Sequence, residues 1–161
     1  NMAGTECLIH QKRRCHMLYI SNLGNIKGRD VIEEGGLPII VDALNRGFCV
    51  NINLWKLPKS FAVGVDYPME EVDPDFLSGN KEKLLLRAMN IESLKWMLEN
   101  GYHCYWREKD DFTVSSHGFI LSFGVAVIPH SIVMNPELCL VDDLRDKNLV
   151  GICSDFILGY K

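Results

Sequence analysis

The chain has 161 residues, of which 47% are hydrophobic and 24% are charged, and its formal net charge is −4. This charge gives no electrostatic basis for binding nucleic acid or an anionic membrane surface, and no run approaches the roughly 18 apolar residues that a membrane span requires. The length predicts one domain with a sizeable core, which we place at residues 18–161 after an N-terminal tail, residues 1–17.

In the first half of the domain, strand-like runs alternate with a helical pattern. The expected elements are a strand at Leu18–Ser21, a glycine-rich loop at Gly24–Gly36, a helix at Leu37–Arg46, a strand at Phe48–Leu54 and an extended run at Phe61–Val65. Side chains alternate along a strand, so Asn51 and Asn53 should share one face and Val50 the other. The loop either presents Lys27 and Arg29 to an anion or is a flexible cover over the strand ends.

The second half begins in the same way and then becomes rich in strands. The expected elements are a helical turn at Asp73–Leu77, a strand at Leu84–Ala88, a helix at Ile91–Asn100 capped by Asn90, and strands at Tyr102–Trp106, Gly118–Phe123, Ser131–Asn135 and Val150–Ser154. Alternating strands and helices are typical of α/β folds with a parallel sheet.

The cysteines predict reduced thiols rather than a zinc site. None forms the closely spaced pair that zinc ligands favour; they are Cys7, Cys15, Cys49, Cys104, Cys139 and Cys153. We expect an intracellular, reducing compartment. An organelle-targeting remnant in the tail, which carries basic residues at positions 12–14, stays open.

Three segments occur in an order and spacing that resemble a known superfamily. They are Leu18–Asn25, Gly47–Trp55 and Ala62–Pro68. The chain resembles the glycerophosphodiester phosphodiesterase superfamily, PLC-like phosphodiesterases with a TIM-barrel fold. The resemblance implies an α/β, compact and partly reduced (β/α)8-like barrel. Such barrels usually take about 250 residues, so several outer helices should be short or missing, leaving wall to be covered by loops, another subunit or a partner.

The superfamily's catalytic residues are absent at the matching positions. Its members carry His-Arg-Gly, Glu-x-Asp and Gly-His-Asp, and they use two histidines and a divalent cation held by carboxylates. The matching tripeptides in this chain are Asn22-Leu23-Gly24, Asn51-Ile52-Asn53 and Gly64-Val65-Asp66. An amide does not titrate near neutral pH and valine has no polar atom, so base, acid and metal ligands are all lost.

Four charged residues could form a residual pocket: Arg87, Glu137, Asp155 and Asp66. One hypothesis puts the Arg87 guanidinium in the place of the lost metal, paired with Glu137 or Asp155, because buried carboxylates need a partner. Two alternatives stay open: Arg87 holds a phosphate without hydrolysing it, or it is a surface residue at a strand end. His103, His117 and His130 are expected to be satisfied or surface residues.

The resemblance therefore predicts a catalytically inactive phosphodiesterase-like protein that acts as a structural or protein-interaction module, within a homo-oligomer or a larger assembly. No cofactor, nucleic acid or membrane partner is expected. Two alternatives remain: a phosphodiesterase with a rearranged site that uses Mg²⁺ or Ca²⁺, acting on a small glycerophosphodiester or cyclic phosphodiester, and a module that binds a phosphate-containing small molecule.

Overall fold

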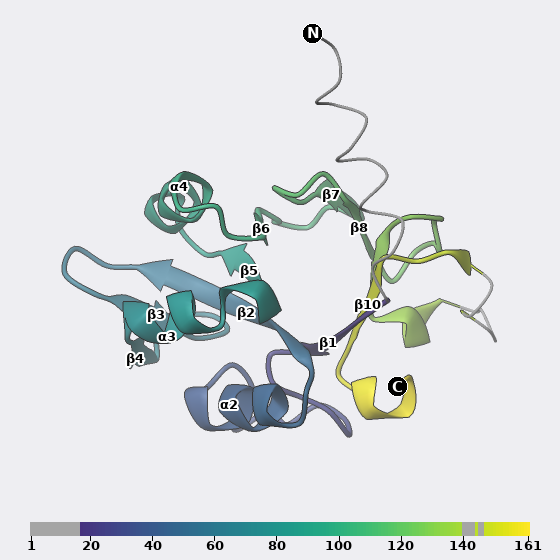
Figure 1. Cartoon of the computed structure of the whole chain (residues 1–161), viewed down its shortest axis with the longest axis horizontal. Helices are drawn as coiled ribbons and strands as arrows, with labels where there is room; N and C mark the ends of the chain where they lie inside the picture. Colours follow the sequence, from purple (N-terminus) through teal and green to yellow (C-terminus); the bar gives the residue numbers. More distant parts are fainter. Residues whose placement is uncertain (1–16, 140–143, 145–146) are drawn as a thin grey trace, which may run out of the picture.

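The computed structural model describes residues 17–139, 144 and 147–161, and their strands form one ten-stranded, mostly parallel sheet (Figure 1). The parallel strands are β1 (Leu18–Asn22), β2 (Cys49–Lys56), β5 (Leu84–Ala88), β6 (Cys104–Tyr105), β8 (Ile120–Phe123), β9 (Ile132–Met134) and β10 (Gly151–Ser154). Three short antiparallel strands join them: β3 (Phe61–Val63), β4 (Glu70–Val72) and β7 (Phe112–Val114). The predicted α/β class is confirmed.

The parallel strands lie side by side in chain order, and the first strand pairs with the last. The order is β6-β5-β2-β1-β10-β9-β8, with β1 between β2 and β10. Within the described part of the chain, no strand ladder joins β6 to β8, so the sheet is open there. The parallel sheet was predicted correctly, whereas the closed TIM barrel is not established by this open sheet.

The two faces of the sheet carry different clusters. On β2, Val50, Ile52 and Leu54 pack in the cluster that contacts the helices, so the predicted alternation with Asn51 and Asn53 is confirmed. The opposite face, called the inner face below, has its own buried cluster. Its members are Ile20, Leu85, Tyr105, Leu121, Ile132, Met134 and Cys153.

The helices gather beside the first half of the sheet. They are α2 (Leu37–Asn45), α3 (Pro74–Gly79) and α4 (Ile91–Glu99), and Figure 1 shows α2 and α4 beside β1, β2 and β5. Asn90 caps α4 by accepting from Ser93 N, as its sequence predicts. In the described residues, only the short 3-10 turns η3 (Pro136–Leu138) and η5 (Ile157–Gly159) follow β9 and β10.

Part of the apolar surface of the sheet is exposed on β7 and β8. Phe112, Val114 and Ile120, on β7 and β8, are exposed and line a shallow hollow of about 310 Å³.

Some predicted boundaries were wrong. The strand expected at Tyr102–Trp106 contains only Cys104–Tyr105, because Tyr102 N donates to Met97 O and so continues the end of α4.

Four cysteines are free thiols: Cys49, Cys104, Cys139 and Cys153. Cys7, Cys15 and the basic cluster of the tail lie outside the described residues. No helix of the described residues is both long and apolar enough to cross a membrane.

Candidate functional site

The parallel register brings three of the predicted site residues together at one end of the sheet. Asn22 is the last residue of β1 and is the register partner of Asn51 on β2. Asp155 directly follows β10, whose Ser154 is paired with Ser21 of β1. Because adjacent parallel strands present register partners on the same face, Asn22, Asn51 and Asp155 form a row across three strands.

A chain of side-chain hydrogen bonds runs along this row. The Tyr105 hydroxyl of β6 donates to Asn51 Oδ1 at 2.9 Å. Asn51 Nδ2 donates to Asn22 Oδ1 at 3.0 Å, and Asn22 Nδ2 donates to Asp155 Oδ1 at 2.9 Å. Each amide thus accepts on its oxygen and donates from its nitrogen, and the chain of donors ends on a carboxylate. We call these four residues the amide relay.

The loop after β1 adds a second carboxylate to the relay. Asn25 Nδ2 donates both to Asp155 Oδ1 at 2.9 Å and to Glu34 Oε2 at 3.1 Å. Glu34 is buried and pairs with Arg29, whose Nη2 lies 2.8 Å from Glu34 Oε1. Glu34, followed by Asp155 and Asp66, raises the pKa of Arg29. Arg29 therefore forms an ion pair with this buried carboxylate. The hypothesis that the loop presents Arg29 to an external anion did not anticipate this role.

Gly24 allows the loop to pass close to α2. Its φ is +91°, and an added Cβ would lie 2.9 Å from the backbone of Ile39 and Ile40. Any other residue would combine a strained left-handed backbone with a collision against backbone atoms. Gly24, which matches the glycine of the superfamily's His-Arg-Gly motif, is therefore required here by the packing of the loop against α2.

The other matching positions lie beside the relay without joining it. Asn53 Nδ2 donates to the Val65 carbonyl oxygen at 3.3 Å, and Asn53 is buried. Asp66 is exposed, and its charge acts on Arg29. Asn53 thus holds the segment after β3 against the sheet, and Val65 contributes only its backbone.

Arg87 does not form the predicted ion pair. It is the register partner of Asn53 and Tyr105, and its Nη2 donates to the Arg107 carbonyl oxygen at 2.8 Å. No salt bridge joins Arg87 to Glu137 or Asp155 among the described residues. Asp155 is instead satisfied by two amides, so the expected pairing was wrong.

Glu137 belongs to a different place in the fold. It accepts from Ser154 Oγ at 2.9 Å and from the Tyr160 hydroxyl at 3.3 Å, and it is exposed on η3. Side chains alternate on β10, so Ser154 points away from the inner face that carries Cys153. Glu137 therefore lies on the opposite side of β10 from the relay.

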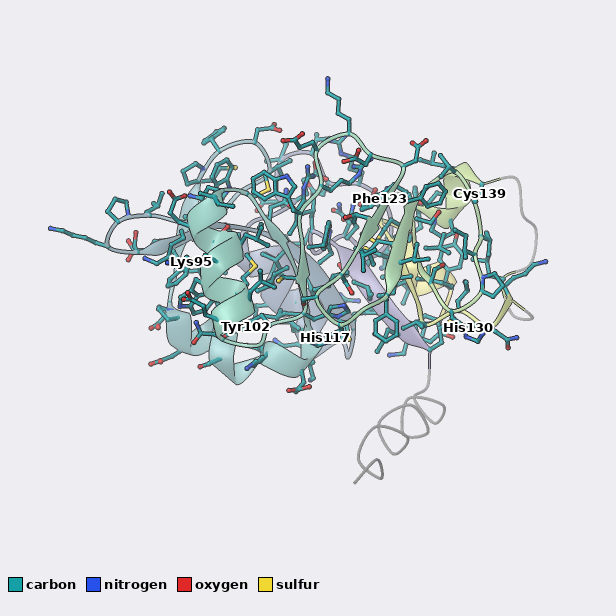
Figure 2. The ribbon with its side chains drawn as sticks, turned by 90° about the horizontal axis from the view of Figure 1, so that it is seen from above. Lys95, Tyr102, His117, Phe123, His130 and Cys139 are labelled. Carbon is teal, nitrogen blue, oxygen red and sulfur yellow. The ribbon has the colours of Figure 1, made fainter. Side chains whose placement is uncertain are left out.

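One charged atom near the relay has no partner. Arg87 Nε is buried and has no hydrogen-bond partner in the described residues. Nearby, the Arg107 guanidinium lies 3.9 Å from the ring centroid of Phe123, and the Tyr105 ring lies 6.1 Å from the same ring. Figure 2 labels Phe123 at this end of β8. Two guanidinium groups thus lie near this end of the inner face.

The relay is suited to hydrogen bonding rather than to proton transfer or cation binding. Burial raises the pKa of Tyr105 far above neutrality, so its hydroxyl stays a donor. Asp155 is the only carboxylate in the relay, whereas hard divalent cations favour several oxygen ligands that include carboxylates. No group of three or more His, Cys, Asp or Glu with metal-binding geometry occurs in the described parts of the chain. The donor set does not fit the superfamily's cation.

Sequence reasoning missed Tyr105, Asn25 and Glu34. Tyr105 lies in an apolar strand where a tyrosine is usually a packing residue. Glu34 follows another glutamate in a polar loop, and nothing in its spacing distinguishes it. The one usable signal was Asn25, which follows Gly24 within the matched segment Leu18–Asn25.

The remaining histidines lie away from the relay. His103 and His117 stack with 4.1 Å between ring centroids and an interplanar angle of 1°, and His103 Nε2 lies 2.7 Å from Ser115 Oγ. Ser115 is only 4% exposed, which leaves no room for a substrate at its hydroxyl. Figure 2 labels His117 at the end of the β7–β8 hairpin opposite Phe123, and His130 in a separate, exposed loop.

Comparisons of the chain with family models, with curated proteins and with solved structures found no match. The resemblance to the superfamily therefore rests on the short sequence motifs alone.

Proposed function

We propose that this chain is a non-catalytic, barrel-like relative of the glycerophosphodiester phosphodiesterases that serves as a structural or protein-interaction module. The amide relay supports the proposal most directly. Asn22, at the position of the first histidine, and Asn51, at one of the metal-ligand positions, are bonded to each other, to Tyr105 and to Asp155. A general base or acid must be free to exchange protons with a substrate near neutral pH, and these amides cannot do so.

The exposed wall of β7 and β8 supports the interaction role. Phe112 is 46% exposed and Val114 is 64% exposed. Adjacent exposed apolar side chains of this kind are typical of surfaces that contact another protein. The barrel-like description draws on the chain-order arrangement of the parallel strands, with β1 paired to β10.

Hydrolysis of glycerophosphodiesters and cyclic phosphodiesters, in Mg²⁺ or Ca²⁺, tests the proposal. We expect no turnover above background, and the same result for Asp155→Asn, which removes the relay's carboxylate. Glu137→Gln is the matched control, because it removes a carboxylate on the other side of β10. Metal-dependent turnover that Asp155→Asn abolishes and Glu137→Gln retains would overturn the non-catalytic proposal.

A second candidate, a module that binds a phosphate-containing ligand, is favoured by the unpaired Nε of Arg87. A buried guanidinium nitrogen without a partner loses solvation that an anion would restore. Inorganic phosphate at millimolar concentration should then raise the melting temperature. The rise should disappear in Arg87→Met and persist in Arg46→Met, an exposed arginine on the outer surface. An equal rise in both variants would contradict binding at Arg87.

A further inference from the structure

The open side of the sheet is closed by a turn rather than by a strand pair. The turn Ser115–Gly118 precedes β8 and contacts β6: Ser116 N donates to Cys104 O at 2.8 Å, and Cys104 N donates to Ser116 Oγ at 2.9 Å. Ser116 Oγ also donates to Tyr102 O at 2.9 Å. We call this junction between β6 and the turn the seam. It rests on few hydrogen bonds, so it is a place where the fold can open locally.

Two histidines face each other across the seam. His103 directly precedes β6 and His117 lies in the turn, and their rings are parallel and in stacking contact. Ser115 Oγ accepts from Phe119 N at 3.3 Å and lies 2.7 Å from His103 Nε2. Ser115 Oγ and His103 Nε2 therefore share one hydrogen bond, whose direction depends on the tautomer of the ring.

The surroundings of His103 favour the neutral ring. Burial first, and the His117 imidazole second, lower the pKa of His103 to about 4. The other elements around its strand bring Arg87 on β5 and Tyr105 on β6, and neither acts on the charge of His103. No carboxylate of the described residues stabilises the imidazolium of His103.

Protonation would strain the histidine contacts that lie across the seam. A protonated His103 carries a hydrogen on Nε2, so Nε2 can only donate to Ser115 Oγ, and the Ser115 hydroxyl proton must turn away from the ring. Two stacked imidazolium rings would repel each other at the observed separation. Both effects act on the same turn, which also carries the hydrogen bonds from Ser116 to β6.

We propose that the stacked pair His103–His117 makes the seam acid-sensitive, so that protonation separates the turn Ser115–Gly118 from β6 and exposes the inner face while the rest of the sheet stays folded. This inference is independent of the proposed function, because it concerns the opposite end of the inner face from the relay. It predicts a local opening in acid, and it would hold equally for an active enzyme.

Thiol labelling of the intact chain tests the seam. Cys153 is fully buried on the inner face, whereas Cys139 is partly exposed. With 4,4′-dithiodipyridine, which reacts with thiols in acid, Cys153 labelling followed by peptide mass spectrometry should accelerate at least about tenfold between pH 7 and pH 4.5, the factor set by one pKa unit. Cys139 should react at both pH values.

Two variants separate the histidine pair from general acid sensitivity. His117→Phe keeps an aromatic ring on His103 but removes the second charge, and His103→Gln keeps an acceptor for Ser115 without a titrating ring. Both should suppress the acceleration at Cys153, and the exposed control His130→Phe should retain it. Equal acceleration in all variants would overturn the proposal, as would loss of the far-UV circular dichroism of the parent chain at pH 4.5.

Discussion

At the residue scale, the amide relay depends on groups that both accept and donate. Asn22 and Asn51 each receive a hydrogen bond on Oδ1 and give one from Nδ2. A carboxylate at either position could accept but not donate, and it would add a negative charge to a row that already ends on the carboxylate of Asp155. Such a charge is costly without a cation. The two asparagines therefore satisfy the hydrogen bonds of the row without a cation.

Tyr105 begins the relay, and removing its hydroxyl tests how much the relay stabilises the fold. In Tyr105→Phe, the buried Asn51 Oδ1 loses its donor, which costs about 1–3 kcal/mol of unfolding free energy. Tyr102→Phe is the matched control, because Tyr102 is equally buried and its hydroxyl has no hydrogen-bond partner among the described residues. We expect a clear drop in the urea midpoint for the first variant and little change for the second. Equal midpoints would mean that the relay adds no stability.

At the element scale, local signals in the sequence were enough to predict most strands and helices. Asn90 with Ser93 predicts the start of α4, and the alternation along Val50–Leu54 assigns the two faces of β2 correctly. Both signals depend on neighbours within a few residues. β7 was missed because it has only three residues, which is too few for the apolar–polar alternation of Phe112–Val114 to identify a strand.

The site was only partly predictable for a different reason. Asn22 and Asn51 were singled out because they stand at the positions of the superfamily motifs, and Asp155 was singled out as a remaining carboxylate. Their meeting at one edge follows from the parallel sheet, whose strand ends lie together. Tyr105 reaches Asn51 across the intervening strand β5, and the Asn51–Tyr105 contact spans 54 residues. The failed pairing of Arg87 with Glu137 shows the same limit, because the sequence does not reveal on which side of β10 a following turn will lie.

At the scale of the whole molecule, the sheet is covered unevenly. Helices α2, α3 and α4 bury the outer side of β2 and β5, whereas Phe112, Val114 and Ile120 remain exposed on β7 and β8. The relay joins β6, β2, β1 and β10 at one end. The half of the sheet with the fewest helices thus also contains the seam. Unfolding of this half should be the least tightly coupled to unfolding of the rest of the sheet.

The last prediction follows from Ser116, whose side chain bonds to the backbone beside β6 across this seam. Ser116 Oγ accepts from Cys104 N and donates to Tyr102 O. In Ser116→Ala, both bonds are lost and the buried amide of Cys104 is left without its acceptor, so unfolding should become easier by about 1–3 kcal/mol. Hydrogen exchange should accelerate first in β6 and β8, before β1 and β2. Ser78→Ala is the control, because its hydroxyl donates one exposed bond within α3. If exchange accelerated uniformly over all the strands, the seam would not be a separate opening unit, and β6 and β8 would be as firmly joined as the paired strands.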